Sequence, residues 1–107
     1  MNKEIIENIK AFVKERDWEQ FHTSENLAKS ISIEANELLE LFQWSSDAKN
    51  VDRIKDELAD IFIYSILLAN KHGLNIEQII LEKIELNKKR YPKDKAKGNA
   101  KKYTEFE

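Results

Sequence analysis

The chain has 107 residues, of which 41% are hydrophobic and 36% are charged, so one domain with a modest core and a heavily charged surface is expected. Its formal net charge of -2 provides no basic field that would attract a nucleic-acid polymer. The absence of cysteine excludes disulfides, thiolate metal ligands and a cysteine nucleophile.

The residue usage favours helix over sheet, because Gly and Pro are scarce and Glu, Lys, Leu and Ile are abundant. The N-terminus lacks the continuous apolar stretch of a signal peptide, and the longest apolar run is too short and too interrupted to span a bilayer. No membrane partner is therefore expected, and the cytoplasm is the expected location.

The first predicted helix covers residues 3–16. Asn2 can cap it, and its apolar stripe consists of Ile5, Ile6, Ile9, Phe12 and Val13. Residues 17–23 then form a connection that carries three rings, Trp18, Phe21 and His22. Rings in a connection are either anchors for the core or a binding surface.

Three further helices follow. The second begins after a cap at Thr23 or Ser24 and runs to about Trp44, and the third begins after Asp47 or Asn50 and ends near Lys71, where His72-Gly73 supplies a stop. Asn75 and Gln78 resemble a capping box that opens a fourth helix, which ends before Pro92.

Short connections between four helices predict an all-α protein, a four-helix bundle with largely antiparallel neighbours. The predicted domain covers residues 1–92. Residues 93–107 form a lysine-rich C-terminal tail that is either disordered or laid over a partner or a site. The third helix is too apolar for a small monomer to cover, which predicts a homodimer or a larger homo-oligomer.

Two acidic pairs stand inside the apolar runs of the second and third helices. Glu34 and Glu37 form the first pair, and Glu57 and Asp60 form the second. Acids three positions apart lie on one face of a helix, so each helix offers two carboxylates to its neighbour. An ionised carboxylate in an apolar setting is costly unless it is paired or binds a metal. Neither apolar run contains a basic residue, so a metal is the simpler compensation.

Ligation by carboxylates alone suits Mg²⁺ or Mn²⁺ better than zinc. Such ions bridge carboxylates to phosphate oxygens and lower the pKa of a bound water, and one carboxylate can act as general base. Hydrolysis of a phosphoanhydride is therefore the expected chemistry. The other interpretation is that the acids are ordinary surface groups, as Glu40 on the polar side of the same helix is expected to be.

Other catalytic patterns are missing or weak. The sequence contains no glycine-rich phosphate loop and no serine and histidine at an informative spacing. A di-iron bundle requires repeated Glu-x-x-His motifs, and only Glu19 and His22 fit that spacing, within the predicted connection.

The two acidic pairs on consecutive helices resemble the MazG-type nucleoside triphosphate pyrophosphohydrolases, which are all-α. The similarity is greatest to the dCTP pyrophosphatase branch, through five segments in the same order: Arg16-Asp17-Trp18-Glu19-Gln20-Phe21-His22, Glu40-Leu41-Phe42-Gln43-Trp44, Ile63-Tyr64, Leu86-Asn87 with Arg90-Tyr91-Pro92, and Lys102-Tyr103-Thr104-Glu105. Animal members of this branch have a histidine where this chain has Ile9, so base selectivity is expected to differ.

The resemblance implies Mg²⁺-dependent cleavage between the α and β phosphates, which yields a nucleoside monophosphate and pyrophosphate. It implies that Glu34, Glu37, Glu57 and Asp60 bind the metal and position or activate water. Non-canonical or surplus deoxynucleotides would be the substrates, with dCTP or 5-modified dCTP as the first expectation, and dimers or tetramers would be the assembly.

The resemblance also implies a set of substrate-binding residues. Trp18 and Trp44 would line the base pocket, where a flat ring suits stacking on a nucleobase, with His22 and Tyr64 beside them. Lys83, Asn87 and Arg90 share a face of the fourth helix and would meet the triphosphate. Lys102 and Tyr103 would fold over a neighbouring subunit's site. For each ring alone, a core or interface role is the alternative.

Three rival functions remain. A dUTP or dUDP hydrolase belongs to the same superfamily, and so does a phosphoribosyl-ATP pyrophosphohydrolase, against which the tryptophan segments count. A non-catalytic helical interaction module, whose acids pair with lysines of a partner, is the rival from another class.

Overall fold

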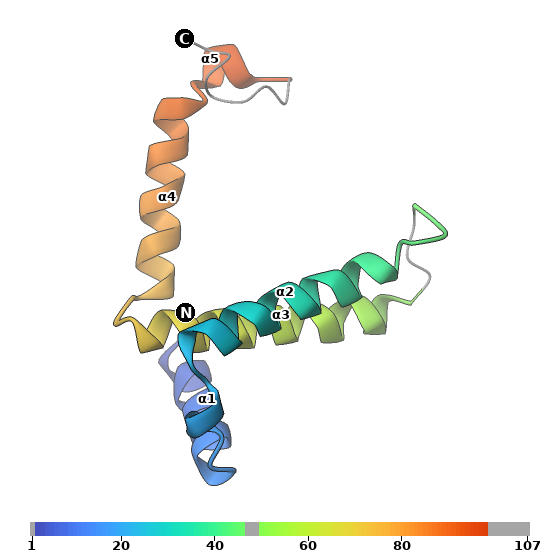
Figure 1. The fold of residues 1–107 in the computed structure, drawn as a ribbon. Helices are drawn as coiled ribbons and strands as arrows, with labels where there is room; N and C mark the ends of the chain where they lie inside the picture. The colour runs from blue at the N-terminus through green and yellow to red at the C-terminus, as the bar shows by residue number, and fades with distance from the viewer. Residues whose placement is uncertain (1, 47–49, 99–107) are drawn as a thin grey trace. The chain divides into compact units, whose positions relative to one another are not determined.

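The computed structural model describes residues 2–46 and 50–98 and contains four long helices (Figure 1). They are α1 (Lys3–Glu15), α2 (Ser24–Glu40), α3 (Val51–Lys71) and α4 (Ile76–Arg90). A short 3₁₀ turn, Glu19–Phe21, lies between α1 and α2, and a four-residue helix, α5 (Lys93–Ala96), follows α4. No strand occurs in the described part of the chain, so the all-α prediction is confirmed.

The long helices begin where the sequence predicts. A side-chain oxygen of each cap residue accepts a hydrogen bond of 2.7 to 3.2 Å from a backbone N–H two or three positions later, and the caps are Asn2, Thr23, Asn50 and Asn75. These bonds satisfy donors that a helix leaves unpaired in its first turn. Asp47, the alternative cap for α3, lies outside the described residues.

Helix α2 ends at Glu40, earlier than the predicted end near Trp44. The backbone N–H groups of Leu41, Phe42 and Gln43 bond to carbonyls only three positions back, at 3.0 to 3.2 Å. Bonds of this type wind the chain more tightly than an α-helix and are common at helix ends. The apolar pattern continues through these turns, which is why it does not reveal where the α-helix stops.

The chain divides into two compact units, residues 1–74 and residues 75–107. In the first unit α2 and α3 lie side by side, and α1 packs against α3 (Figure 1). The buried apolar side chains come from all three helices: Ile9, Val13, Leu27, Ile66 and Ala69. Ser24 Oγ and His72 Nε2, 2.9 Å apart, join the start of α2 to the end of α3.

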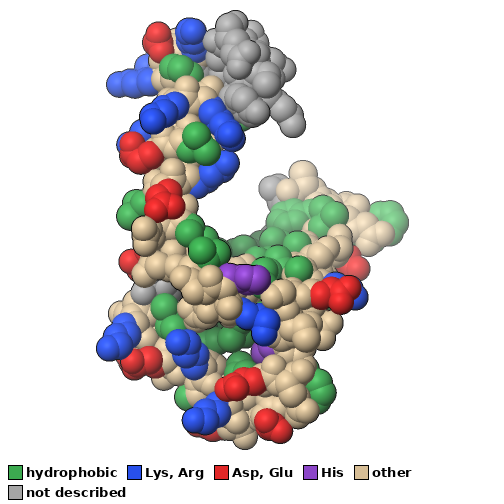
Figure 2. Space-filling view, turned by 60° about the vertical axis from the view of Figure 1, so that its left-hand side comes forward, with side chains coloured by type: hydrophobic (Ala, Val, Ile, Leu, Met, Phe, Trp, Pro, Cys, Tyr) green, Lys and Arg blue, Asp and Glu red, His purple; other side chains and the backbone are tan. Residues whose placement is uncertain are grey.

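Much apolar surface of the first unit is exposed within that unit, and Figure 2 shows hydrophobic side chains gathered on its surface. On α3 the exposed large apolar side chains are Val51, Leu58, Phe62 and Ile63, and Phe62 is 55% exposed. The prediction that α3 is too apolar for a monomer to cover agrees with this exposure.

The second unit, taken by itself, consists of α4 and α5 with a surface rich in basic side chains (Figure 2). Its isoleucine stripe includes Ile80 and Ile84, which are exposed within the unit. The predicted domain boundary at Pro92 stays a prediction. Among the described residues, no helix combines the length and the apolar character that crossing a bilayer requires.

Leu27 is 1% exposed and is the largest side chain that is fully buried. We expect Leu27→Ala to lower the free energy of unfolding by about 2–5 kcal/mol, because it removes apolar contacts and leaves a cavity. The measurement is urea unfolding at a fixed protein concentration. The control is Ser32→Ala, at an exposed position on the same helix, which should cost less than about 0.5 kcal/mol. Equal losses for the two variants would contradict the packing described here.

Candidate active site

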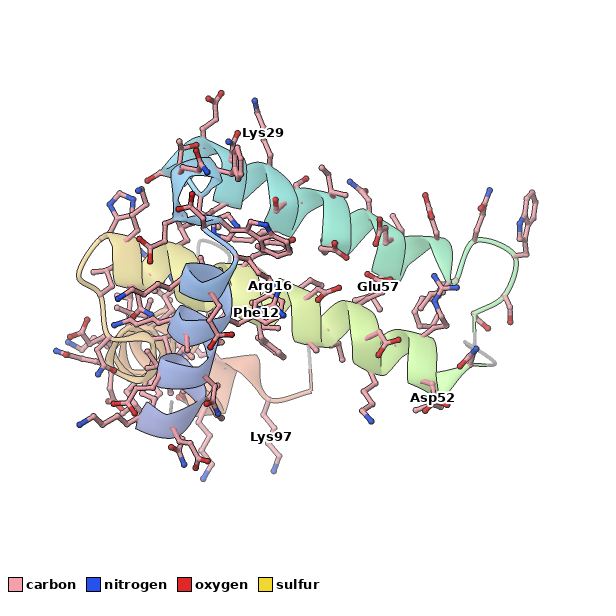
Figure 3. All side chains as sticks on the ribbon, turned by 90° about the horizontal axis from the view of Figure 1, so that it is seen from below. Phe12, Arg16, Lys29, Asp52, Glu57 and Lys97 are labelled. Atoms are coloured by element: carbon pink, nitrogen blue, oxygen red, sulfur yellow. The ribbon has the colours of Figure 1, made fainter. Side chains whose placement is uncertain are left out.

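Three carboxylates converge between α2 and α3. Oxygen atoms of Glu34, Glu37 and Glu57 all lie within 4.8 Å of one another. The first two come from successive turns of α2, so they share its face, and Glu57 comes from the helix alongside (Figure 3). Glu57 is 7% exposed, and the other two are half-buried. The predicted cluster is therefore present for three of its four members.

Asp60, the fourth predicted member, lies one turn after Glu57 and is exposed. It is outside the 4.8 Å group but close enough for its charge to raise the pKa of Glu34. Asp60 also lines an apolar pocket of the first unit. It therefore stands between the carboxylate cluster and that pocket.

The close approach of the carboxylates raises the pKa of one of them, Glu34. Hydrogen bonding with Glu57 is the largest cause that raises the pKa of Glu34 from 4.5 to about 8. Burial acts in the same direction, as do the hydrogen bond and the negative charge of Glu37 and the charge of Asp60. Near neutral pH, Glu34 therefore holds a proton when no cation compensates the charges, because two adjacent carboxylates cannot both ionise at low cost.

Within residues 2–46 and 50–98, a cationic neighbour of the cluster is Arg53, which the sequence analysis missed. Arg53 lies one turn before Glu57, and its Nη2 is 3.9 Å from the Glu57 carboxylate. Arg53 is 55% exposed at its side chain, and the contact is at the limit of ion-pair distance, so it compensates little of the clustered charge. The i, i+4 spacing of Arg53 and Glu57 could have predicted this contact. The search for basic partners covered only the apolar run, and Arg53 lies before it.

The donor set fits a divalent cation with a preference for oxygen. The Oε2 atoms of Glu34 and Glu57 are both buried, and neither has a hydrogen-bond partner. Buried carboxylate oxygens without partners are costly, and a bound Mg²⁺ or Mn²⁺ would remove that cost. Because the cluster contains no sulfur or imidazole ligand, it suits hard cations better than zinc.

A pocket of about 400 Å³ opens beside the cluster in the first unit. Of the predicted site residues, it brings together Trp18, His22, Asp60 and Tyr64. The rest of its lining was not predicted as site residues: Asn8, Ile9, Phe12, Val13, Ile63 and Leu67. The sequence analysis links one residue of the apolar stripe of α1, Ile9, to base selectivity and otherwise assigns the stripe to the core, although its outer edge forms one wall of this pocket.

The connection after α1 sets Trp18 in that wall. Asp17 has a φ of 54°, which reverses the chain, and the Trp18 N–H then donates to the Val13 carbonyl at 3.1 Å. The Trp18 ring meets Phe12 edge to face at 5.6 Å between centroids. On Phe12, the Arg16 guanidinium lies 3.8 Å from the ring centroid (Figure 3). The rings are thus held by packing and not left as a flexible surface.

His22 and Tyr64 form the polar end of the pocket. Their rings lie 6.4 Å apart in an edge-to-face arrangement, and the His22 Nδ1 atom is buried without a partner. Burial is the largest cause that raises the pKa of Tyr64, followed by the charges of Glu34, Asp60 and Glu37. Tyr64 therefore keeps its phenolic proton and stands beside the carboxylates as a hydrogen-bond donor.

Several predicted substrate-binding residues are not in this assembly. Trp44 is 90% exposed in the turns after α2 and does not line the pocket. Lys83, Asn87 and Arg90 lie on α4 in the second unit, with Asn87 and Arg90 half-buried and Lys83 exposed. Lys102 and Tyr103 lie outside the described residues. The roles predicted for these six residues stay predictions: Trp44, Lys83, Asn87, Arg90, Lys102 and Tyr103.

Residues 29–106 match the family model described as MazG-like. Two curated relatives are named dCTP pyrophosphatase 1. The rat protein is 39% identical to this chain over 104 residues, and the human protein is 37% identical over 104 residues. The matched region covers 89% of this chain, and the chain spans 61% of the length of these relatives.

A solved structure, described as a pyrophosphatase from Archaeoglobus fulgidus, superposes with a TM-score of 0.80 and 34% sequence identity. The match covers 84% of this chain and 91% of that one.

The raised pKa of Glu34 predicts how the stability of the metal-free protein depends on pH. The folded protein holds this proton up to about pH 8, whereas the unfolded chain releases it near 4.5. The contribution of Glu34 to the free energy of unfolding is therefore full below pH 4.5 and is lost as the pH rises through about 8. Glu34→Gln mimics the protonated state, so we expect it to be increasingly more stable than the parent as pH rises.

Thermal unfolding in EDTA at acidic, neutral and alkaline pH measures this difference. Glu40→Gln, at an exposed position on the same helix, is the control and should follow the parent at every pH. A difference between Glu34→Gln and the parent that is constant over the whole range would contradict the raised pKa.

Proposed function

The chain belongs to the MazG-like family, and from this we propose that it is a metal-dependent nucleotide pyrophosphohydrolase. It cleaves a nucleoside or deoxynucleoside triphosphate between the α and β phosphates and releases the monophosphate and pyrophosphate. The observation that carries this proposal is the carboxylate cluster adjoining an apolar, aromatic pocket, with Asp60 at the junction.

The division of the site matches the two ends of a nucleotide. A triphosphate needs cations and ordered water, which the cluster of Glu34, Glu37 and Glu57 is built to hold. A base needs flat apolar walls with a few polar groups, and Trp18 with its neighbours supplies them. One ligand that spans both regions explains why a buried acidic cluster adjoins an apolar pocket.

The residues carry distinct roles in this reaction. Glu34, Glu37, Glu57 and Asp60 hold the metal, for which Mg²⁺ is the first choice and Mn²⁺ the second. Once bound there, the cation neutralises phosphate charge and lowers the pKa of a coordinated water. One of the four carboxylates accepts the proton of the attacking water. Tyr64, at the edge of the cluster, serves as a hydrogen-bond donor.

The expected substrate is dCTP or a 5-modified dCTP, in keeping with the names of the relatives. Trp18 stacks on the base, and the unpartnered Nδ1 of His22 forms a hydrogen bond with a polar atom of the base. The alternative within the superfamily is a dUTP or dUDP hydrolase, for which the same pocket would accept uracil. In either case the reaction removes unwanted nucleotides from the cellular nucleotide pool. We expect the protein to act in the cytoplasm.

The phosphate chain needs cationic contacts besides the metal. Lys83, Asn87 and Arg90 occur at positions i, i+4 and i+7 of α4, which puts them on one face of that helix. We assign them to the triphosphate, together with Lys102 and Tyr103 from the C-terminal segment.

We further propose a homodimer or homotetramer. Leu58, Phe62 and Ile63 on α3 are exposed in the single chain, and apolar surface of this extent marks a contact between proteins. Trp44 is 90% exposed and lies away from the pocket of its own chain. A second copy that covers α3 would allow Trp44 to meet the base in a neighbouring pocket.

A panel of deoxynucleoside triphosphates with Mg²⁺ tests the reaction. We expect turnover to monophosphate and pyrophosphate, identified by chromatography of the products. Glu37→Gln should lower kcat by about a thousandfold or more, because it removes a charged ligand from the site that stabilises the transition state. Glu40→Gln is the matched control on α2 and should retain the activity of the parent.

Release of a diphosphate and phosphate would contradict the proposed cleavage position. No turnover of any nucleotide, combined with unchanged Mn²⁺ affinity in Glu37→Gln, would favour the non-catalytic interaction module.

The assembly has its own test. We expect Phe62→Lys to shift the protein from an oligomer to a monomer in sedimentation experiments, because it places a charge on the exposed apolar face of α3. A parent protein that is monomeric at micromolar concentration, or a variant with unchanged sedimentation, would contradict the proposed interface.

A further inference from the structure

One polar residue of the pocket is not explained by the metal cluster or by the predicted substrate contacts. Besides the indole of Trp18, which packs against Phe12, the pocket contains four side chains that can form hydrogen bonds: Asn8, His22, Asp60 and Tyr64. Asp60 and Tyr64 belong electrostatically to the carboxylate cluster, and His22 packs against Tyr64. Asn8 is the remaining one and comes from α1, which forms a different wall.

The Asn8 carboxamide is available to a ligand. In the described residues 2–46 and 50–98 it forms no hydrogen bond. Asn8 is exposed, whereas the next residue, Ile9, is buried, and both line the pocket, whose wall on α1 is otherwise apolar. An amide that is free in the unliganded pocket can form hydrogen bonds with a ligand without breaking any that stabilise the fold.

Its place on α1 relates it to the stacking rings. Asn8 and Phe12 are four residues apart, so their side chains are neighbours on one face of the helix. Phe12 is packed against Trp18, and the Arg16 guanidinium lies over the Phe12 ring and donates to the Phe12 carbonyl. A base that stacks on this aromatic wall therefore has an edge within reach of the amide.

We infer that Asn8 reads the hydrogen-bonding edge of the base and sets the base preference of the enzyme. This inference rests on the proposed nucleotide pyrophosphohydrolase activity. A carboxamide offers one donor and one acceptor in a plane, which is the pattern that asparagine uses to contact an adenine edge in DNA. Cytosine presents the same pairing of an exocyclic amino group beside a ring nitrogen acceptor. A flip of the amide would instead match uracil or thymine.

The distinguishing measurement is the ratio of kcat/KM values for different bases. We expect Asn8→Leu, which keeps the branched shape but loses both polar atoms, to lower kcat/KM roughly tenfold for the preferred base and less than about twofold for the least preferred. Asn8→Asp retains only acceptors, so it should shift preference towards bases with an exocyclic amino group over those with a carbonyl. Glu7→Gln, an exposed neighbour on α1 that does not line the pocket, is the matched control and should change neither value.

The outcomes separate this inference from the activity on which it rests. A parent that hydrolyses no nucleotide overturns the proposed function. A parent that is active but whose base ratios are unchanged in Asn8→Leu overturns the assignment of Asn8. An equal loss for every nucleotide also overturns it, because that would indicate a general disturbance of α1. Mn²⁺ titration of Asn8→Leu, with affinity equal to the parent, shows that the carboxylate cluster is intact.

Discussion

The desolvation of carboxylates between α2 and α3 is the constraint on which the rest of the site depends. Glu57 is among the few buried residues of the first unit, in positions that ordinarily hold apolar side chains. Two of its near neighbours are also acids, and their mutual repulsion is relieved without metal only by keeping a proton on Glu34. The fold thus holds together a set of acidic groups whose charges a divalent cation would compensate.

This cost explains the surroundings of the cluster. The strong packing of α2 along α3 fixes the three carboxylates before any ligand arrives, so binding a metal needs little reorganisation. Tyr64 lines the apolar pocket, and its hydroxyl remains protonated because burial and the neighbouring negative charges raise its pKa. The carboxylate cluster and the pocket therefore share α3, and Asp60 on that helix lines the pocket and acts electrostatically on Glu34.

Much of this arrangement could be predicted from the sequence because its signals are local. Helix caps such as Thr23 and Asn50 are short-range patterns, and the acidic pairs fall on helix faces by simple periodicity. The end of α2 could not be located, since its apolar pattern runs on through tighter turns. The contact of Arg53 with Glu57 was overlooked because the basic residue lies before the apolar run.

The wall of the pocket was harder to predict, because the same stripe of α1 serves two purposes. Val13 is buried against the core, while Phe12 and Asn8 are exposed enough to face a ligand. Periodicity distinguishes the apolar face from the polar face, but a residue at the border of the two faces belongs to neither until the packing of α1 on α3 is known. Asn8 occupies such a border position. Specificity determinants are therefore expected at the edges of amphipathic stripes, where one side chain can reach both a buried wall and an incoming ligand.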